Sequence, residues 1–310
     1  MSFYEDDFVY PPNEIRKAID LGGFYRASIE KDTHFFHYTD KQGLEGILRS
    51  QELWATDYRY LNDENEFAIV EASIPEAIAN LQLEKSIEKY LEKKLIEEIH
   101  RQNSTVRQEQ SFFVTCFSLN GDSLLLWSEF ASRLGCNLEI HQRHVHKVRP
   151  GIIRYPGKVI YNRLEQLRVI QESFFHMLPR ATTVKKLLEY FLEENLEKEM
   201  NQYITSVALL CRYYSMFMKD QVYSDEMEYR VVYKIIDDSV KVRYREKAGF
   251  PERIPYIGIP VAPENEKIPI ESICLNPKLH GFSVQKEYRS MCEKLGYSIP
   301  IKESRAALRY

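Results

Sequence analysis

Three short stretches of the sequence carry side chains that could perform chemistry. The first is FFHYTD (residues 35–40), in which His37 is followed directly by Tyr38 and Thr39. Imidazole and hydroxyl groups both donate and accept hydrogen bonds, so at the end of a strand they suit the hydroxyl groups of a sugar. A lone histidine in such a place is more often a structural residue, and that alternative stays open.

The second stretch is EMEYRVVY (residues 226–233), which has the pattern of a strand. Alternation along a strand places Glu228 and Arg230 on one face, with Tyr229 and Val231 on the other. A guanidinium beside a carboxylate keeps the carboxylate ionised, and the negative charge then stabilises a cationic transition state. The alternative is an edge strand whose polar face is solvated.

The third stretch is VTCFSLNGDSLLLW (residues 114–127). Ser118 ends an apolar strand, and Asp122 is predicted to cap the helix that follows. Cys116 lies within the strand, where a buried and inert thiol is expected. Neither a Ser-His-Asp nor a Cys-His arrangement of the kind that activates a nucleophile is evident from the spacing.

A histidine-rich segment, EIHQRHVHKVR (residues 139–149), could provide metal ligands from Glu139, His141, His144 and His146. The spacing matches neither the HExxH helix nor other metal signatures. If a strand ends in this segment and a helix follows, the rings point in divergent directions. We therefore predict no metal site, and a metal-dependent hydrolase remains a minor alternative.

The elements that must position these residues follow from hydrophobic periodicity. Asp40 is predicted to cap a helix over 41–51 that buries Leu44, Ile47 and Leu48. Further helices are expected near 13–21, over 64–108, 122–132, 163–220 and 283–295, and strands over 35–38, 52–57, 111–120, 136–141, 157–162, 228–236, 254–261 and 271–277. The pattern predicts a single α+β domain, residues 1–310, whose mainly antiparallel sheet is interrupted by helical insertions at about 64–108 and 163–220.

Composition narrows the class of protein. The 310-residue chain has 42 basic and 46 acidic side chains and a net charge of −4, which argues against a protein that coats nucleic acid. Its five cysteines show no paired spacing, and neither a signal sequence nor an apolar run of membrane-spanning length is present. A cytoplasmic protein without membrane attachment is expected, and the long Leu-rich helices could supply a homodimer surface.

Three ordered boxes, FHYTD with YLNDENEF, CFSLNGDSLLLW, and EMEYR, resemble a widespread bacterial family of unknown function over about residues 35–280. The first and last boxes also resemble the ADP-ribosyltransferase fold of poly(ADP-ribose) polymerases and diphtheria-type toxins, which implies a split antiparallel sheet. In those enzymes a strand-borne histidine precedes a helix, and the catalytic glutamate opens a strand similar to MEYRVVY. The resemblance thus implies an NAD-dependent ADP-ribosyltransferase or NAD glycohydrolase, in the setting of a bacterial toxin or phage-defence effector.

On this resemblance His37 holds an NAD ribose, and Glu228 stabilises the oxocarbenium-like transition state as nicotinamide leaves. Tyr38, Thr39, Ser118 and Arg230 would line the NAD site. Tyr58, Tyr60 and Trp127 are the rings considered for stacking on nicotinamide. The expected ligand is NAD as substrate, without a metal, and the sequence leaves the acceptor of the ADP-ribosyl group undefined.

Two departures distinguish the chain from those enzymes. Tyr38 stands where the polymerases usually carry the glycine after the histidine, and Glu52 replaces a glycine after the first helix. A non-catalytic module that binds a nucleotide or a protein on the same fold is therefore the main alternative.

Overall fold

The computed structural model describes residues 32–61, 66–105, 112–131, 135–145, 150–176, 178, 182–246, 251–262, 266–279 and 281–306. The strands are β1 (His34–Thr39), β2 (Glu52–Asp57), β3 (Phe112–Ser118), β4 (Cys136–His141), β5 (Ile152–Lys158), β6 (Glu228–Ile235), β7 (Arg243–Arg245), β8 (Ile254–Pro260), β9 (Ser272–Leu275) and β10 (Ile301–Glu303). The helices are α2 (Lys41–Ser50), α3 (Glu66–Ala79), α4 (Lys85–Thr105), α5 (Leu124–Glu129), α6 (Gln142–Val145), α7 (Arg163–His176), α8 (Val184–Glu193), α9 (Glu197–Ser215) and α10 (Phe282–Lys294), with 3₁₀-helices η2 (Tyr58–Tyr60) and η4 (Gln221–Glu226).

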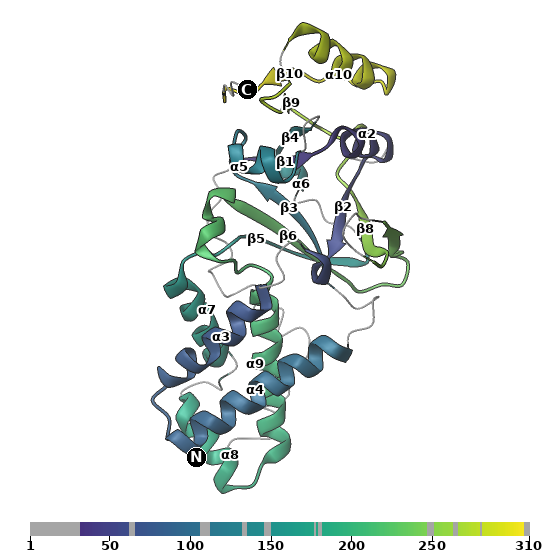
Figure 1. Ribbon diagram of the computed structural model, residues 1–310. Helices are drawn as coiled ribbons and strands as arrows, with labels where there is room; N and C mark the ends of the chain where they lie inside the picture. The colour runs from purple at the N-terminus through teal and green to yellow at the C-terminus, as the bar shows by residue number, and fades with distance from the viewer. Residues whose placement is uncertain are drawn as a thin grey trace. The chain divides into compact units, whose positions relative to one another are not determined.

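The chain folds into two compact units. The described parts of 62–107 and 160–221 form a helical unit, and those of 28–61, 108–159 and 222–310 form a unit built on the sheet. The two predicted helical insertions, far apart in the sequence, therefore gather in one unit of their own (Figure 1). The helix expected near 13–21 lies outside the described residues.

The helical unit is built around α9, which contacts α3, α4, α7 and α8. Twelve side chains of α9 are buried, so this helix has the all-round burial of a central element. Polar bonds tie the neighbouring helices together: Tyr203 on α9 donates to the carbonyl of Phe174 on α7, and Gln102 on α4 donates to the carbonyl of Thr205.

The sheet is open and mostly antiparallel, with the strand order β10-β9-β4-β1-β3-β2-β8-β7. β3 pairs with β6 along its whole length, and β6 pairs in turn with β5. On the opposite edge, β3 pairs with β1 only at Ser118 and with β2 only at Phe113 and Val114. The sheet therefore splits along this edge of β3 into a branch starting with β1 and a branch starting with β2.

Side chains replace the ladder bonds that are lost where β1 and β2 leave β3. The Nδ1 atom of His37 lies 3.0 Å from the carbonyl oxygen of Cys116. Thr115 donates from its hydroxyl to the carbonyl of Trp54 at 3.5 Å. Because a buried carbonyl without a partner is costly, these side chains help the sheet to divide at this place.

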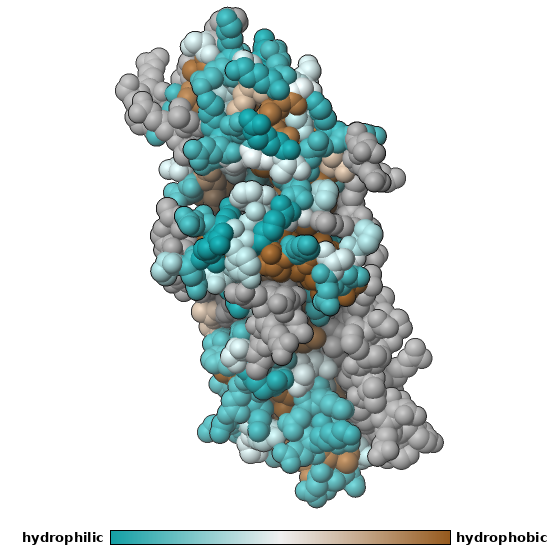
Figure 2. Space-filling view, turned by 90° about the vertical axis from the view of Figure 1, so that its right-hand side faces the viewer, coloured by the Kyte–Doolittle hydropathy of each residue, from teal (hydrophilic) through white to brown (hydrophobic). Residues whose placement is uncertain are grey.

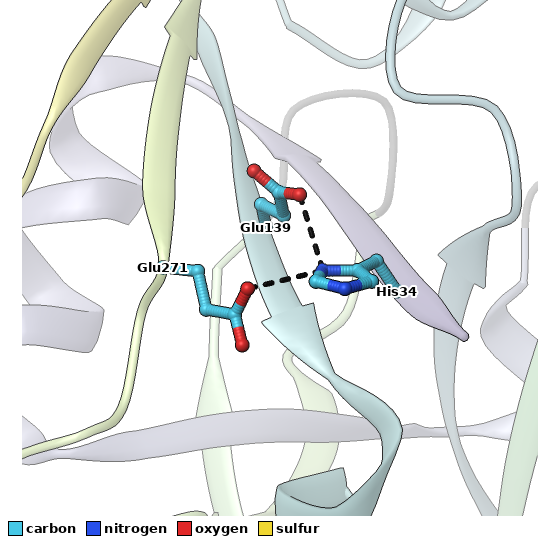
Figure 3. Close-up of side chains that lie close together, drawn as sticks. All are labelled: His34, Glu139 and Glu271. Carbon is cyan, nitrogen blue, oxygen red and sulfur yellow. Dashed lines mark ion pairs between the residues drawn. The ribbon is translucent and has the colours of Figure 1, made fainter. Parts of the chain in front are cut away.

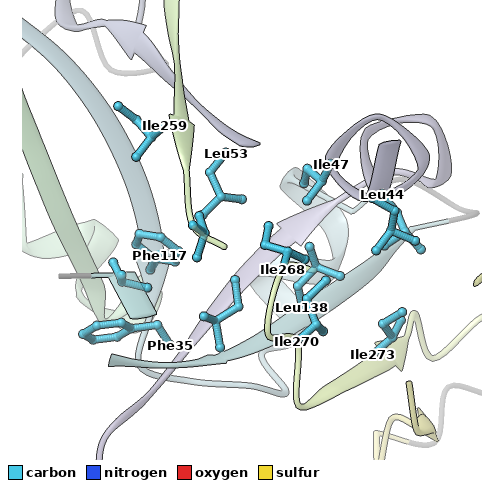
Figure 4. Close-up of a cluster of buried hydrophobic side chains, with 14 of the residues drawn as sticks. Phe35, Leu44, Ile47, Leu53, Phe117, Leu138, Ile259, Ile268, Ile270 and Ile273 are labelled. Carbon is cyan, nitrogen blue, oxygen red and sulfur yellow. The ribbon is translucent and has the colours of Figure 1, made fainter. Parts of the chain in front are cut away.

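The main hydrophobic core lies on one face of this sheet. Odd-numbered residues of β1, β2 and β3, such as Phe35, Leu53 and Phe117, point into it, and Leu138 of β4 joins them (Figure 4). Helices α2 and α10 contribute further residues, among them Leu44, Ile47, Leu48, Tyr288 and Cys292. As predicted, Asp40 caps α2, accepting from the backbone N–H of Gly43 at 2.6 Å.

Two element predictions need correction. The strand expected over 157–162 lies earlier, at β5, and contains Pro156. Proline is tolerated there because β5 pairs only with β6 among the described residues, so the missing N–H faces no partner strand. The helix expected over 122–132 is shorter, and Ser123, not Asp122, caps it by accepting from Leu126 N–H.

The described surface is mostly polar on the face shown in Figure 2. Figure 2 shows one face of the molecule, where hydrophilic residues cover most of the coloured area and hydrophobic ones gather in a few patches. Within the described ranges, no helix combines the length and the apolar character needed to cross a bilayer.

Candidate functional site

His37 lies at the split of the sheet, where β1 leaves β3. Its Nδ1 must donate to the Cys116 carbonyl, because a carbonyl oxygen can only accept. Burial is the main cause that lowers the pKa of His37, opposed by this bond and reinforced by the positive charge of Arg245. His37 is therefore neutral at pH 7. Its Nε2, which has no hydrogen-bond partner among the described residues, is then an acceptor.

Tyr38 is engaged in holding the next loop. Its hydroxyl donates to the carbonyl of Asn120 and accepts from the backbone N–H of Ser123, and its ring packs edge-on against Trp127. Burial is the largest cause that raises the pKa of Tyr38 to about 12. Thr39 lies opposite Cys136 on β4 and is half-buried. The Tyr38 hydroxyl is thus already used to hold this loop and is not free to bind a ligand.

Ser118 is likewise used by the fold. Its hydroxyl donates to the carbonyl of Glu226 at 2.7 Å and accepts from the N–H of Asn120 at 2.9 Å. The serine is buried, and its position opposite Glu228 on β6 fixes the start of that strand. Its bonds explain the serine structurally.

Glu228 and Arg230 lie on one face of β6, as alternation predicts, and form a two-pronged ion pair. Arg230 Nε and Nη2 each donate to a carboxylate oxygen of Glu228 at 2.9 Å. The side chains are only 8% and 2% exposed, and β6 lies between β3 and β5. The alternative of a solvated edge strand is therefore wrong, and the carboxylate is held by its neighbour, as the functional interpretation required.

The structure does not bring His37 and Glu228 to one face of the sheet. Phe36, Ser118 and Glu228 lie opposite one another on β1, β3 and β6, so their side chains share a face. His37 is the next residue along β1 and points to the other face, where its ring contacts Phe117 at 5.9 Å. The predicted ribose clamp and the predicted catalytic carboxylate are thus separated by the sheet.

The three rings considered for stacking are all engaged in packing or hydrogen bonds. Tyr58 is buried edge-on against Phe112, and Tyr60 donates to Glu252. Trp127 is buried and donates from Nε1 to Asp122 at 2.8 Å. A ligand would have to displace existing contacts to stack on any of them.

A group that the sequence analysis missed lies on the β2 branch, beside the split. The Arg245 guanidinium on β7 donates to the hydroxyl of Thr56 at 3.0 Å and lies 5.3 Å from the ring of Trp54. Trp54 in turn contacts Tyr256 at 4.6 Å and is 38% exposed, which is unusual for a ring of this size. An arginine and a partly exposed aromatic ring therefore lie together, and the charge of Arg245 is near enough to His37 to lower its pKa.

Arg245 differs from its neighbour Arg243 in how its charge is compensated. Arg243 donates to the Glu52 carboxylate at 2.6 Å, whereas Arg245 has no acidic partner among the described residues. The Nε of Arg245 is shielded from solvent and unpartnered there, and burial lowers the pKa of the group. Glu52, Trp54 and Thr56 alternate along β2 and therefore lie on one face of the strand. This polar face with a tryptophan is the sequence pattern that could have indicated a site here.

The histidine-rich segment divides between a strand and a helix, as expected. His141 ends β4 and accepts through Nδ1 from the Arg143 N–H, and the Arg143 side chain bonds His144 Nε2 at 2.9 Å. His146 lies outside the described residues. Glu139 instead faces His34, which lies outside this segment.

Comparisons with family models, curated protein sequences and solved structures found no match to this chain. The resemblance to ADP-ribosyltransferases therefore depends on the sequence boxes.

Proposed function

We propose that the sheet unit binds a nucleotide beside the split, with NAD or ADP-ribose as the ligand that the resemblance indicates. The observation that carries this proposal is Arg245, a half-buried cation whose Nε is shielded from solvent and which has no acidic partner among the described residues. A partly desolvated charge without a counter-charge is costly, so an anionic ligand would be favoured there. A phosphate suits a guanidinium because the fork of N–H donors matches its oxygens.

The neighbouring side chains suit the other parts of a nucleotide. The ring of Trp54 contacts Arg245 and Tyr256 but is 38% exposed, so its exposed part offers a surface on which a base can stack. Neutral His37 presents an acceptor nitrogen for a ribose hydroxyl. This role for His37 is the one that the resemblance implied, but its partner would be Arg245 and not Glu228.

Turnover of NAD would be a further step, and the geometry favours it less than binding. Glu228 is paired with Arg230 and directed to the opposite face from His37. For transferase or glycohydrolase chemistry, the carboxylate would have to leave that pair and reach the nicotinamide ribose. We therefore propose a nucleotide-binding module on a split sheet of the ADP-ribosyltransferase-like type. Turnover of NAD by the same unit is the second candidate function.

Titration calorimetry with NAD and with ADP-ribose tests the binding site. Replacing Arg245 by Gln is expected to weaken binding about 10- to 100-fold, the value of one charge-assisted hydrogen bond. Arg243→Gln is the matched control, because it removes a cation two residues away that Glu52 already neutralises. Equal affinity for the parent and Arg245→Gln would refute the site.

Nicotinamide release from NAD separates binding from catalysis. Release that is lost in Glu228→Gln would support the transferase or glycohydrolase. Binding of both ligands without any release would support the module.

A further inference from the structure

A second group of chemically active side chains lies on the β1 branch of the sheet. His34 begins β1, Glu139 lies on β4, and Glu271 immediately precedes β9. The strand pairing brings them together: His34 lies opposite His141, two residues from Glu139, and Glu139 lies opposite Ser272, next to Glu271. Three segments far apart in the chain thus meet at one point.

The geometry of this cluster converges on the Nδ1 atom of His34. One oxygen of Glu139 and one of Glu271 each lie 3.1 Å from this nitrogen, and they approach it from different directions (Figure 3). The three potential ligand atoms all lie within 4.8 Å of one another. The His34 nitrogen is shielded from solvent, yet it makes no well-aligned hydrogen bond with any described residue.

A single N–H group satisfies such an arrangement poorly, because a hydrogen shared between two oxygens is well aligned with neither, and His34 Nδ1 makes no well-aligned bond here. A metal ion can, since it binds the nitrogen lone pair and both oxygens together. With bonds of about 2.1 Å, ligand atoms 3.1 Å apart subtend an angle of about 95° at the ion, which is within the range of metal sites. Glu271 lies at the surface and has room to adjust.

The surroundings of Glu139 resemble the outer shell of a metal site. Its second oxygen accepts from the Ser272 hydroxyl and from Lys302 Nζ, which leaves the first oxygen directed toward His34. Ligating carboxylates are commonly held in this way by hydrogen bonds to the oxygen that does not bind the metal. Two carboxylates with one lysine nearby also leave negative charge that a divalent ion would neutralise.

We infer that His34, Glu139 and Glu271 form a binding site for a divalent transition-metal ion such as Zn²⁺. One imidazole and two carboxylates are the ligands of a borderline ion and not of a soft one. Three protein ligands leave coordination positions open to water, because His34 and Glu271 are each about one third exposed. The site is separate from the nucleotide site proposed above, and it differs from the histidine-rich segment, whose His141 and His144 bond to Arg143.

The test is calorimetry of the full-length protein, stripped by a chelator, with ZnCl₂ and, separately, with MgCl₂ and CaCl₂. We expect one equivalent of Zn²⁺ to bind and to raise the melting temperature, because an ion that binds only the folded state stabilises it. His34→Ala and Glu271→Gln should each weaken Zn²⁺ binding at least 100-fold. Glu271 is exposed, so its variant should fold even if the His34 variant does not.

The matched control is His100→Ala, which removes an exposed histidine that faces only one carboxylate, Glu71, at 2.7 Å. This variant should bind Zn²⁺ like the parent. Failure of the parent to bind Zn²⁺, preference for Mg²⁺ or Ca²⁺, or unchanged binding in Glu271→Gln would each overturn the inference.

Discussion

Two histidines of one strand, three residues apart, have opposite electrostatic surroundings. His34 faces two carboxylates, whereas His37 lies near the positive charge of Arg245 and bonds to a neutral carbonyl. They point to opposite faces of β1 because side chains alternate along a strand. An imidazole gains its role from the charges around it: His34 suits a cation, and neutral His37 suits a hydroxyl of a ligand whose anionic group Arg245 binds.

The third charged group, Glu228 with Arg230, has no uncompensated charge that would favour either a cation or an anion. Glu228 is already neutralised by Arg230 in a buried, two-pronged pair. The comparison therefore separates a satisfied pair from two groups with uncompensated charge, the cluster at His34 and the cation Arg245. Four experiments test it, beginning with the largest expected effect.

Replacing Arg230 by Met should destabilise the protein by about 3–5 kcal/mol, because the buried Glu228 then loses its two-pronged ion pair. Denaturant unfolding monitored by circular dichroism measures the loss. Arg49→Met is the control: its pair with Glu45 is exposed, and removal should cost no more than about 1 kcal/mol. A similarly small cost for Arg230→Met would show that the buried Glu228–Arg230 pair contributes no more to stability than an exposed pair, which would contradict the prediction.

The two uncompensated groups should respond independently to mutation. Glu271→Gln should weaken Zn²⁺ binding by about 100-fold or more, since losing a ligand exceeds the 10- to 100-fold cost of losing an outer-shell group. The same variant should bind NAD like the parent. Arg245→Gln should show the reverse, and calorimetry with both ligands on both variants measures this. If one of these variants lost affinity for both Zn²⁺ and NAD, the two sites would not be independent.

The pH dependence of stability should report His37. Because its pKa is lowered in the folded state, the unfolded chain binds the proton more readily. Stability is then fully present above the unfolded pKa of about 6.5 and falls as the pH drops below it, by at most about 1.4 kcal/mol per pH unit. His37→Gln should flatten unfolding curves between pH 7.5 and 5.5. An unchanged slope would contradict the neutral imidazole.

The two carboxylates of the proposed metal site should differ in the metal-free protein. Glu139→Gln should cost about 1–2 kcal/mol, because Ser272 and Lys302 both bond to this carboxylate. Glu271→Gln should cost less than about 0.5 kcal/mol, since its ion pair is exposed. Thermal unfolding in the presence of a chelator measures both, and equal costs would mean that Glu139 is not the anchored ligand.

Local features of the fold could be predicted because their causes lie close together in the sequence. The Asp40 cap, the buried face of α2 and the apolar strand β6 each follow from a few neighbouring residues. The position of β5 was missed because Pro156 argues against a strand unless the strand lies at an edge. Asp122 was misassigned as a cap because its actual partners, Trp127 and the segment at Ser304, include one far along the chain.

The candidate sites were only partly predictable for a related reason. Alternation correctly placed Glu228 beside Arg230, because both residues are on one strand. The opposite faces of Glu228 and His37 depend on the register of β1, β3 and β6, which no local pattern reveals. The meeting of His34, Glu139 and Glu271 depends on two strand pairings of the same kind.

Pro156 has a consequence for how copies of this chain behave at high concentration. An open sheet has free edges that can pair with other molecules and lead to aggregation. Here β5 carries a proline, and β7 and β10 are three residues long with charged side chains. The described edges thus offer poor templates for intermolecular strand addition, which lets the protein keep a branched sheet without closing it into a barrel.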